Sequence, residues 1–282
     1  MNGTANGVLL VGHGSKSDQA TGELRRLAGL VADALPDEHV GLGFLELTDP
    51  PAGEVLDSLV GQGCRRVTVL PLMLLGAGHT KSDVPAIVLG ARDRHPHVDV
   101  RLGSPLGVAH DLIATLGPAI EPGLPLLLIA RGTSDPDANG DACKVARLLG
   151  EWSGAPFAHT AFTGVTGPRV TDGLDVFARL GFPRMAVAFW FLCSGLLVER
   201  ARTEIDEFAA RTGVEVGDAG YLGPDPRIVP VVLDRYRQAL ANDPAVNCDL
   251  CAYRAPWPGK QGRVHQAIGI GHSHHAAQHH HR

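Results

Sequence analysis

Three residues that can bind metals or transfer protons recur at equal intervals in the first half of the chain. Glu46 follows His13 by 33 residues, and His79 follows Glu46 by another 33. Two imidazoles and a carboxylate suit a divalent transition metal. The same groups can serve as general bases, because histidine titrates near neutral pH. Singly, each is explained as well by a solvated loop or, for Glu46, by a lysine partner. Their regular spacing favours one shared site.

Each of the three residues follows an apolar run typical of a buried strand. The first run, residues 8–11, ends in Gly12-His13-Gly14-Ser15. Strands are predicted near 7–11, 39–45, 66–72 and 97–102, and helices near 17–35, 51–62, 81–94 and 107–120. This alternation predicts a parallel sheet with helices on both faces. Parallel strands end at one edge, where ligands bind in such sheets, so we expect the three side chains to converge there.

The second half of the chain repeats the first with an offset of 118 residues. Residues 126–134 repeat the strand, turn and hydroxyls of residues 8–16, and the register continues without a gap, with Phe44 matching Phe162 and Pro50 matching Pro168. Strands are predicted near 125–130, 157–162, 185–191 and 214–217, and helices near 138–151, 169–180, 197–211 and 226–241. The sequence therefore predicts an α/β protein of two tandem, doubly wound parallel-sheet lobes, related by internal duplication and separated by a cleft.

Three regions follow from this repeat. Residues 1–120 are expected to form the lobe with the metal site, residues 121–241 a degenerate second lobe, and residues 242–282 a tail. The second lobe has Arg131, Gly164 and Leu197 where the first has the three candidate ligands, so one metal site is expected per chain. A guanidinium pairs with carboxylates in a fork, which suggests an anionic ligand across the cleft.

Composition restricts the possible functions. The chain has 282 residues, of which 44% are hydrophobic, and a net charge of −5, which does not favour a nucleic-acid partner. No apolar run is long enough to span a bilayer, and the N-terminus lacks the pattern of a signal peptide. Five cysteines, an odd number, fit a reducing cytoplasm. We therefore expect a cytoplasmic protein with neither a membrane nor a nucleic-acid partner.

The motifs resemble those of the sirohydrochlorin chelatases, which are class II tetrapyrrole chelatases. The resemblance rests on Val-Gly-His-Gly-Ser after the first strand, a glutamate after the second, and Gly-x-His-x-x-x-Asp after the third. It covers residues 7–240 and corresponds to the long, two-domain form. It implies insertion of Fe²⁺ or Co²⁺ into sirohydrochlorin without ATP, for siroheme or cobalamin synthesis. By position, His13 and His79 would bind the metal and accept pyrrole protons, and Glu46 would be a ligand or proton acceptor.

The carboxylates of such a substrate need hydrogen-bond donors or cations around the cleft. The candidates lie near the predicted strand ends: Ser15, Lys16, Thr80, Lys81, Ser104, Arg131, Thr133 and Ser134. Ordinary helix capping explains the hydroxyl residues equally well.

The tail carries Cys248-x-x-Cys251 and a histidine-rich end. Some long cobalt chelatases are similar, with an iron–sulfur cluster at such a pair. The remaining ligands would come from a second subunit, from Cys143 or Cys193, or from tail histidines. The protein is accordingly expected to be a monomer or a homodimer, with the dimer formed if a cluster bridges two tails. The histidines would store or deliver metal, and a cloning tag is the alternative.

A second function from another class fits the same residues. A metal-binding carrier or sensor would use the histidines at the strand ends and in the tail without turnover. A coproporphyrin or protoporphyrin substrate is a weaker alternative within the chelatase interpretation. Imidazole ligands suit both iron and cobalt, so the sequence does not select the metal.

Overall fold

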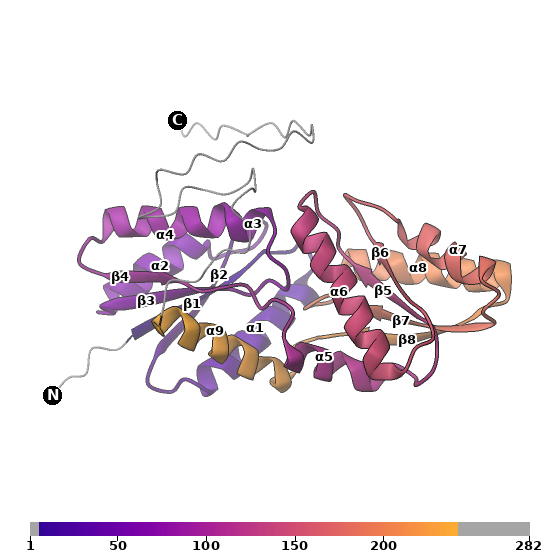
Figure 1. Cartoon of the computed structure of the whole chain (residues 1–282). Coiled ribbons are helices and arrows are strands. Elements are labelled where there is room, and N and C mark those ends of the chain that lie inside the picture. Colours follow the sequence, from indigo (N-terminus) through magenta and orange to yellow (C-terminus); the bar gives the residue numbers. More distant parts are fainter. Residues whose placement is uncertain (1–5, 242–282) are drawn as a thin grey trace, which may run out of the picture.

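The computed structural model describes residues 6–241, which form two four-stranded parallel sheets side by side (Figure 1). The sheet of the N-terminal lobe contains β1 (Asn6–Gly12), β2 (His39–Phe44), β3 (Arg66–Pro71) and β4 (Asp99–Leu102). The sheet of the C-terminal lobe contains β5 (Leu126–Ala130), β6 (Ala158–Phe162), β7 (Arg184–Phe189) and β8 (Glu215–Tyr221). The predicted class, α/β with two tandem parallel-sheet lobes, is confirmed.

Strand order places the site-bearing strands next to one another. The orders are β2-β1-β3-β4 and β6-β5-β7-β8, so β1 and β5 lie inside their sheets. In the N-terminal lobe, Gly12 at the end of β1 pairs with Phe44 at the end of β2. On the other side of β1, Val11 pairs with Pro71, the last residue of β3. The three strands therefore end level, and the segments after them begin at the same edge.

The helices connect successive strands, as the alternating pattern predicts. In the first half they are α1 (Asp18–Asp33), α2 (Ala52–Gly61), α3 (Gly78–Lys81), α4 (Asp83–Arg94), α5 (His110–Leu116) and the 3₁₀ turn η1 (Gly117–Ala119). In the second half they are α6 (Pro136–Ser153), α7 (Val170–Arg179), α8 (Leu196–Thr212), the 3₁₀ turn η2 (Pro226–Ile228) and α9 (Val229–Ala241). The predicted helix at 81–94 corresponds to α4, and the short helix α3 precedes it, separated from it at Ser82. Pro85 cannot donate a hydrogen bond to the Lys81 carbonyl, so one continuous helix is disfavoured.

Two helices pack against the lobe to which they do not belong in sequence. Helix α5 packs against α6 and β8, whereas the last helix, α9, returns to β3, β4 and α1 (Figure 1). Polar contacts hold α9 there: Arg235 donates to the carbonyls of Pro105 and Leu106, and Tyr236 donates to Glu38. Helices α5 and α9 thus pack across the predicted boundary between residues 120 and 121. The boundary itself stays a prediction.

One hydrophobic core is shared by the lobes, and each lobe has a second core of its own. Alternate residues of a strand face opposite sides of a sheet. Val8 and Leu10 of β1 belong to the shared core together with Leu126 and Leu128 of β5. The intervening residues of each strand belong to the separate core of their own lobe. Because the shared core is continuous, the lobes are held against each other by apolar packing.

The internal repeat extends to backbone details. Asp49-Pro50 and Gly167-Pro168 are cis peptide bonds. Leu47 and Val165, which also lie 118 residues apart, both have positive φ, at 61° and 65°. Such matching local geometry fits a duplicated unit that kept its scaffold.

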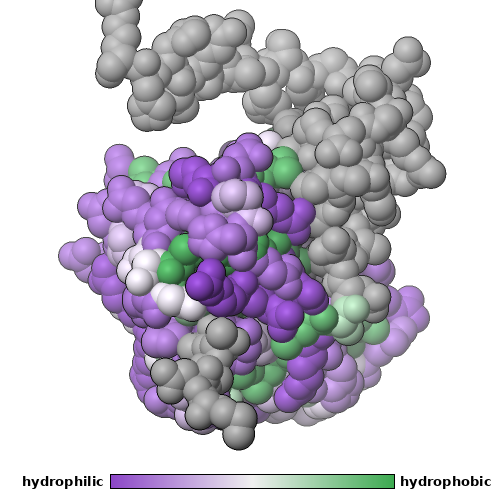
Figure 2. Space-filling view, turned by 90° about the vertical axis from the view of Figure 1, so that its left-hand side faces the viewer, coloured by the Kyte–Doolittle hydropathy of each residue, from purple (hydrophilic) through white to green (hydrophobic). Residues whose placement is uncertain are grey.

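The surface of the protein is largely polar. The face seen in Figure 2 is mostly hydrophilic, and apolar side chains show only in small separate areas. Within residues 6–241, none of the helices combines the length and apolar character needed to cross a bilayer.

Candidate metal centre

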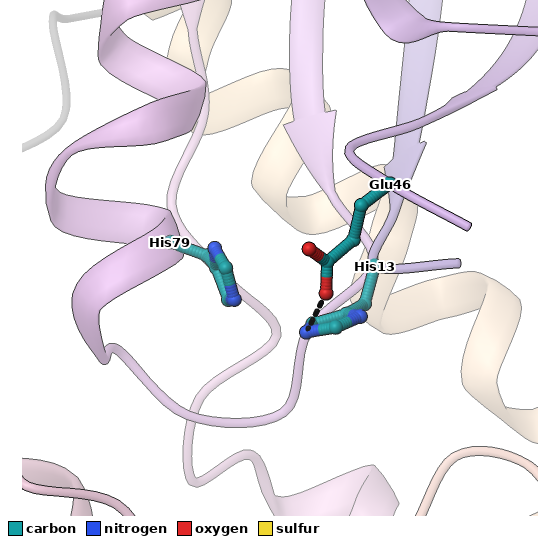
Figure 3. Close-up of side chains that lie close together, drawn as sticks. All are labelled: His13, Glu46 and His79. Atoms are coloured by element: carbon teal, nitrogen blue, oxygen red, sulfur yellow. Dashed lines mark ion pairs between the residues drawn. The ribbon is translucent and has the colours of Figure 1, made fainter. Parts of the chain in front are cut away.

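The structure brings His13, Glu46 and His79 together at the carboxyl edge of the first sheet (Figure 3). His13 directly follows β1, Glu46 lies two residues after β2, and His79 is the second residue of α3. One potential ligand atom from each lies within 4.8 Å of those of the other two. Such a set can close around a single transition-metal ion with modest side-chain adjustment.

His13 presents its Nε2 atom to the centre of this group. Its Nδ1 atom lies 3.2 Å from the Gly14 carbonyl, which places the ring proton on Nδ1 and leaves Nε2 as an acceptor. Nε2 is shielded from solvent and makes no hydrogen bond within the part of the chain that the structure describes. It lies 3.4 Å from Oε1 of Glu46. A buried nitrogen lone pair without a donor is suited to bind a cation.

His79 is oriented by a carboxylate from the next helix. Its Nδ1 atom contacts Oδ2 of Asp83, one helical turn further along the chain. This contact fixes the ring and leaves Nε2 for another partner. A carboxylate behind a histidine is a common arrangement in metal sites, where it fixes the tautomer and the orientation of the ligand ring.

Backbone contacts tie Glu46 to His13. The Glu46 amide donates to the His13 carbonyl over 3.1 Å. Gly14 has a φ of 96°, and a Cβ there would collide with the Glu46 carbonyl, so the turn requires glycine. The Thr48 hydroxyl donates to the Ser15 carbonyl and accepts from its amide. The loops after β1 and β2 are therefore held together as one unit.

Burial is the main cause that lowers the pKa of His13 below its ordinary value of 6.5. The positive charges of Arg131 and His79 lower this pKa further, whereas the Gly14 carbonyl and Glu46 act to raise it. The ring is therefore neutral at neutral pH, which is the form that binds a metal. Because Arg131 follows β5, the C-terminal lobe acts electrostatically on the site.

The eight residues predicted to contact the substrate differ in their surroundings. Lys16 and Arg131 are exposed, and Ser104 and Ser134 are half-buried. Three hydroxyls have local partners: that of Ser15 accepts from Ser17 N, that of Thr80 donates to Ala77 O, and that of Thr133 accepts from Asp135 N. These bonds lie within the turns before α1 and α6 or within α3, whereas the side-chain caps of α1 and α6 come from Ser17 and Asp135 rather than from these three residues.

Lys81 does not face a ligand, contrary to expectation. Its side chain is only 4% exposed, and Nζ lies 2.7 Å from Asp135 and 3.1 Å from Asp137. Both carboxylates belong to the C-terminal lobe. The expectation offered Lys81 as a donor to the carboxylates of the substrate, whereas its burial commits it to these two acids.

The second lobe lacks an equivalent centre. Within residues 6–241, His13, Glu46 and His79 form the one group of three or more potential ligands close enough to share an ion. At the equivalent positions the second lobe has Arg131, Gly164 and Leu197, which offer no such set of ligands.

The three cysteines within residues 6–241 are not part of this centre. Cys143 is exposed, and burial raises the pKa of Cys193 to about 12 and also raises that of Cys64. Cys248 and Cys251, where an iron–sulfur cluster was expected, lie outside the described residues.

Sequence reasoning missed the contribution of Asp83, Asp135 and Asp137. Asp83 lies within the quoted Gly-x-His-x-x-x-Asp motif, and its spacing of four residues from His79 is the signal that could have identified it. The two acids of the C-terminal lobe gave no such signal, because their partner is more than 50 residues away.

Comparison with known proteins agrees with the geometry. The family model CbiX matches residues 7–121 and again residues 125–239. The chain is 31% identical over 258 residues to a sirohydrochlorin cobaltochelatase of Priestia megaterium, covering 88% of this chain and 84% of that protein. It is 30% identical over 247 residues to a sirohydrochlorin ferrochelatase of Bacillus subtilis strain 168, covering 83% and 92%.

A solved structure shows the same arrangement of elements. The structure of SirB from Bacillus subtilis with Fe³⁺ superposes with a TM-score of 0.76 at 26% identity, covering 84% of this chain and 96% of that one. Both repeats of the chain match the family model, and the relatives cover most of its length. The chain therefore belongs to the CbiX family.

Proposed function

We propose that this protein inserts a divalent metal, Fe²⁺ or Co²⁺, into sirohydrochlorin without ATP. The observation that carries the proposal is the convergence of His13, Glu46 and His79, each with a potential ligand atom within 4.8 Å of the others. The relatives named as sirohydrochlorin cobaltochelatase and ferrochelatase support the choice of substrate.

In this proposal the metal is a substrate that the three side chains hold first. Neutral imidazole nitrogens replace water molecules around the cation, and the Glu46 carboxylate offsets part of its charge. The lowered pKa of His13 favours this step, because less proton must be displaced at neutral pH. The half-exposed Glu46 side chain leaves the metal accessible from solvent.

The second task is removal of the two pyrrole protons. The ring loses both N–H protons as the dication enters, so its net charge is unchanged. As the metal leaves the protein, the nitrogens of His13 and His79 and the oxygens of Glu46 become available as proton acceptors. The contact between Asp83 and His79 would hold the His79 ring in place during this transfer.

The substrate would be bound through its carboxylates and the exposed cations at the same edge. Lys16 and Arg131 follow β1 and β5 and are both exposed. One comes from each lobe, so they can hold opposite sides of a large polyanion. All groups in the proposal come from one chain, and a second subunit is not needed for the site.

The test compares insertion of Fe²⁺ and of Co²⁺, side by side without oxygen, by the change in the visible spectrum of sirohydrochlorin. We expect acceleration over the metal-only control, and loss of nearly all of it in His13→Ala. His39→Ala is the matched control, because His39 is exposed at the first residue of β2, at the opposite edge of the sheet. If the wild-type protein binds Co²⁺ but does not accelerate insertion, the carrier or sensor function replaces this proposal.

An iron–sulfur cluster at Cys248 and Cys251 is a separate proposal that rests on the sequence pair alone. The visible spectrum of the protein purified without oxygen tests it, and a colourless preparation would contradict it.

A further inference from the structure

We propose that a buried link between Lys81 and the C-terminal lobe sets the position of His79 for metal binding. Lys81 is a positioning residue in this inference, which rests on the proposed chelatase function for the meaning of the metal. The link consists of Lys81 at the end of α3 and of Asp135 and Asp137 at the start of α6.

Helix α3 cannot hold His79 in place by its own stability. It has four residues, and the chain leaves helical geometry at Ser82 directly after it. One turn of helix is unstable in isolation, so tertiary contacts must fix it. Of its four residues, only Thr80 and Lys81 are buried. Since Thr80 bonds back to Ala77 in its own turn, Lys81 is the anchor to another element.

The partner of this anchor is buried just as deeply. Asp135 is 1% exposed, and its two carboxylate oxygens have different tasks. Oδ1 accepts from the amide of Asp137 and caps α6, whereas Oδ2 lies 2.7 Å from the Lys81 ammonium. In Figure 1, α3 lies opposite the first turn of α6. A movement of α6 relative to the first sheet would thus be passed to the segment that carries His79.

The internal repeat shows that this link accompanies the metal site. Ser17 occupies the position of Asp135 in the first half and caps α1 through its hydroxyl. A cap therefore needs no carboxylate here, so capping alone does not explain a buried acid. The residue equivalent to Lys81 is the exposed Glu199, in the repeat where leucine replaces the metal-binding histidine. The lysine of the link is therefore present in the lobe with the candidate metal site and is replaced by an acid at the equivalent position of the other lobe.

Adhesion between the lobes has other sources. Besides the shared core, Glu23 of α1 accepts from the amide of Ser194 and from the hydroxyl of Tyr221 in the C-terminal lobe. A buried ion pair is a weak source of net stability but fixes geometry, since its desolvation is offset only at close range. Lys81 is accordingly better suited to positioning α3 than to holding the two lobes together.

The test measures Co²⁺ binding to the full chain by visible absorption, without tetrapyrrole. Because tail histidines can also bind Co²⁺, binding at the site is defined as the part lost in His79→Ala. The double variant Lys81→Met, Asp135→Asn has no charge at either position, and its asparagine can still cap α6. We expect its Co²⁺ affinity to be about tenfold weaker, with an altered absorption band. The matched control Glu23→Ala breaks a different polar contact between the lobes, that of Glu23 with Ser194 and Tyr221, and should leave the Co²⁺ affinity at the site unchanged.

Two results would overturn the inference. One is an unchanged affinity and spectrum in the folded double variant. The other is an equal loss of total Co²⁺ binding when the same substitutions are made in the His79→Ala background, because the effect would then not pass through His79. If the double variant does not fold, Asp137→Asn decides, since that carboxylate is partly exposed and does not cap α6. A measurably weaker Co²⁺ affinity supports the link, and an unchanged one contradicts it.

The outcome is separate from that of the proposed function. If the protein inserts no metal but its variants show this pattern of Co²⁺ affinities, the link is supported and the chelatase proposal is refuted. If the protein inserts metal but the wild type and the link variants have equal Co²⁺ affinity, the chelatase proposal stands and the link is refuted.

Discussion

The imidazole rings of His13 and His79 meet edge to face, with their centroids 4.6 Å apart and their planes at 89°. One ring is held by the turn after β1 and the other by Asp83 behind α3. Since the rings touch, rotation of one changes the space available to the other. The spacing of the two potential metal ligands therefore depends on groups that do not themselves face the metal.

The first prediction concerns Asp83. Replacement by alanine removes the acceptor that fixes the Nδ1 proton of His79, so the ring can rotate and change tautomer. We expect Co²⁺ affinity at the site to fall about tenfold, the size typical for loss of a carboxylate behind a ligand histidine. Titration with Co²⁺ measures it.

The control for this change is Asp111→Ala. Asp111 contacts Nδ1 of His110 on the exposed start of α5, away from the cluster. It should leave Co²⁺ affinity unchanged. Equal affinities in the Asp83 and Asp111 variants would show that Asp83 has no part in metal binding.

The second prediction concerns the pKa of His13. Arg131→Gln removes a positive charge that lowers this pKa, so the value should rise toward 6.5 while burial keeps it below. The acid limb of metal binding should then move to higher pH, because the proton competes better with the metal. NMR titration of the His13 ring in metal-free protein measures the shift directly.

The same shift has a consequence for stability. The pKa of His13 is lower in the folded protein than its ordinary value of 6.5 in the unfolded chain. The contribution of neutral His13 to the free energy of unfolding is therefore complete above pH 6.5 and is lost as the pH falls through the folded-state pKa. In Arg131→Gln that loss should be smaller. Arg147→Gln is the control, because Arg147 is exposed on α6 and pairs with Glu151. A His13 titration identical in wild type and Arg131→Gln would refute the coupling between the lobes.

The features that the sequence predicted well are those set by local pattern and parallel topology. The apolar run before His13 is typical of a buried strand, and parallel pairing places the ends of β1, β2 and β3 level. Once these ends are level, equal spacing places the three side chains at one edge. The duplication was equally visible, because an unbroken offset needs no structural knowledge.

The features that it could not predict depend on packing between distant segments. Nothing local in 226–241 indicates that α9 covers the sheet of the other lobe, since an amphipathic helix fits either sheet. Lys81 illustrates the same limit. A lysine side chain is normally solvated, and this one is buried only because Asp135 and Asp137, distant in the sequence, lie beside it in the fold.

The last prediction uses the two equivalent turns at Gly14 and Gly132. Both have positive φ, at 96° and 80°, and a Cβ at either would collide with a backbone carbonyl, that of Glu46 in one turn and that of Gly164 in the other. Alanine should therefore lower the free energy of unfolding by about 3 kcal/mol at each position. Chemical denaturation measures both changes.

The two substitutions should nevertheless differ in their effect on metal binding. In Gly14→Ala the clash moves the backbone of Glu46, which is hydrogen-bonded to that of His13, so two ligands lose their relative position. In Gly132→Ala the same strain falls on Gly164, which offers no ligand. Under conditions where both variants are folded, Co²⁺ binding at the site should be lost in the first and kept in the second. Equal binding in both would mean that the turn after β1 serves the fold alone and that the metal tolerates displacement of Glu46.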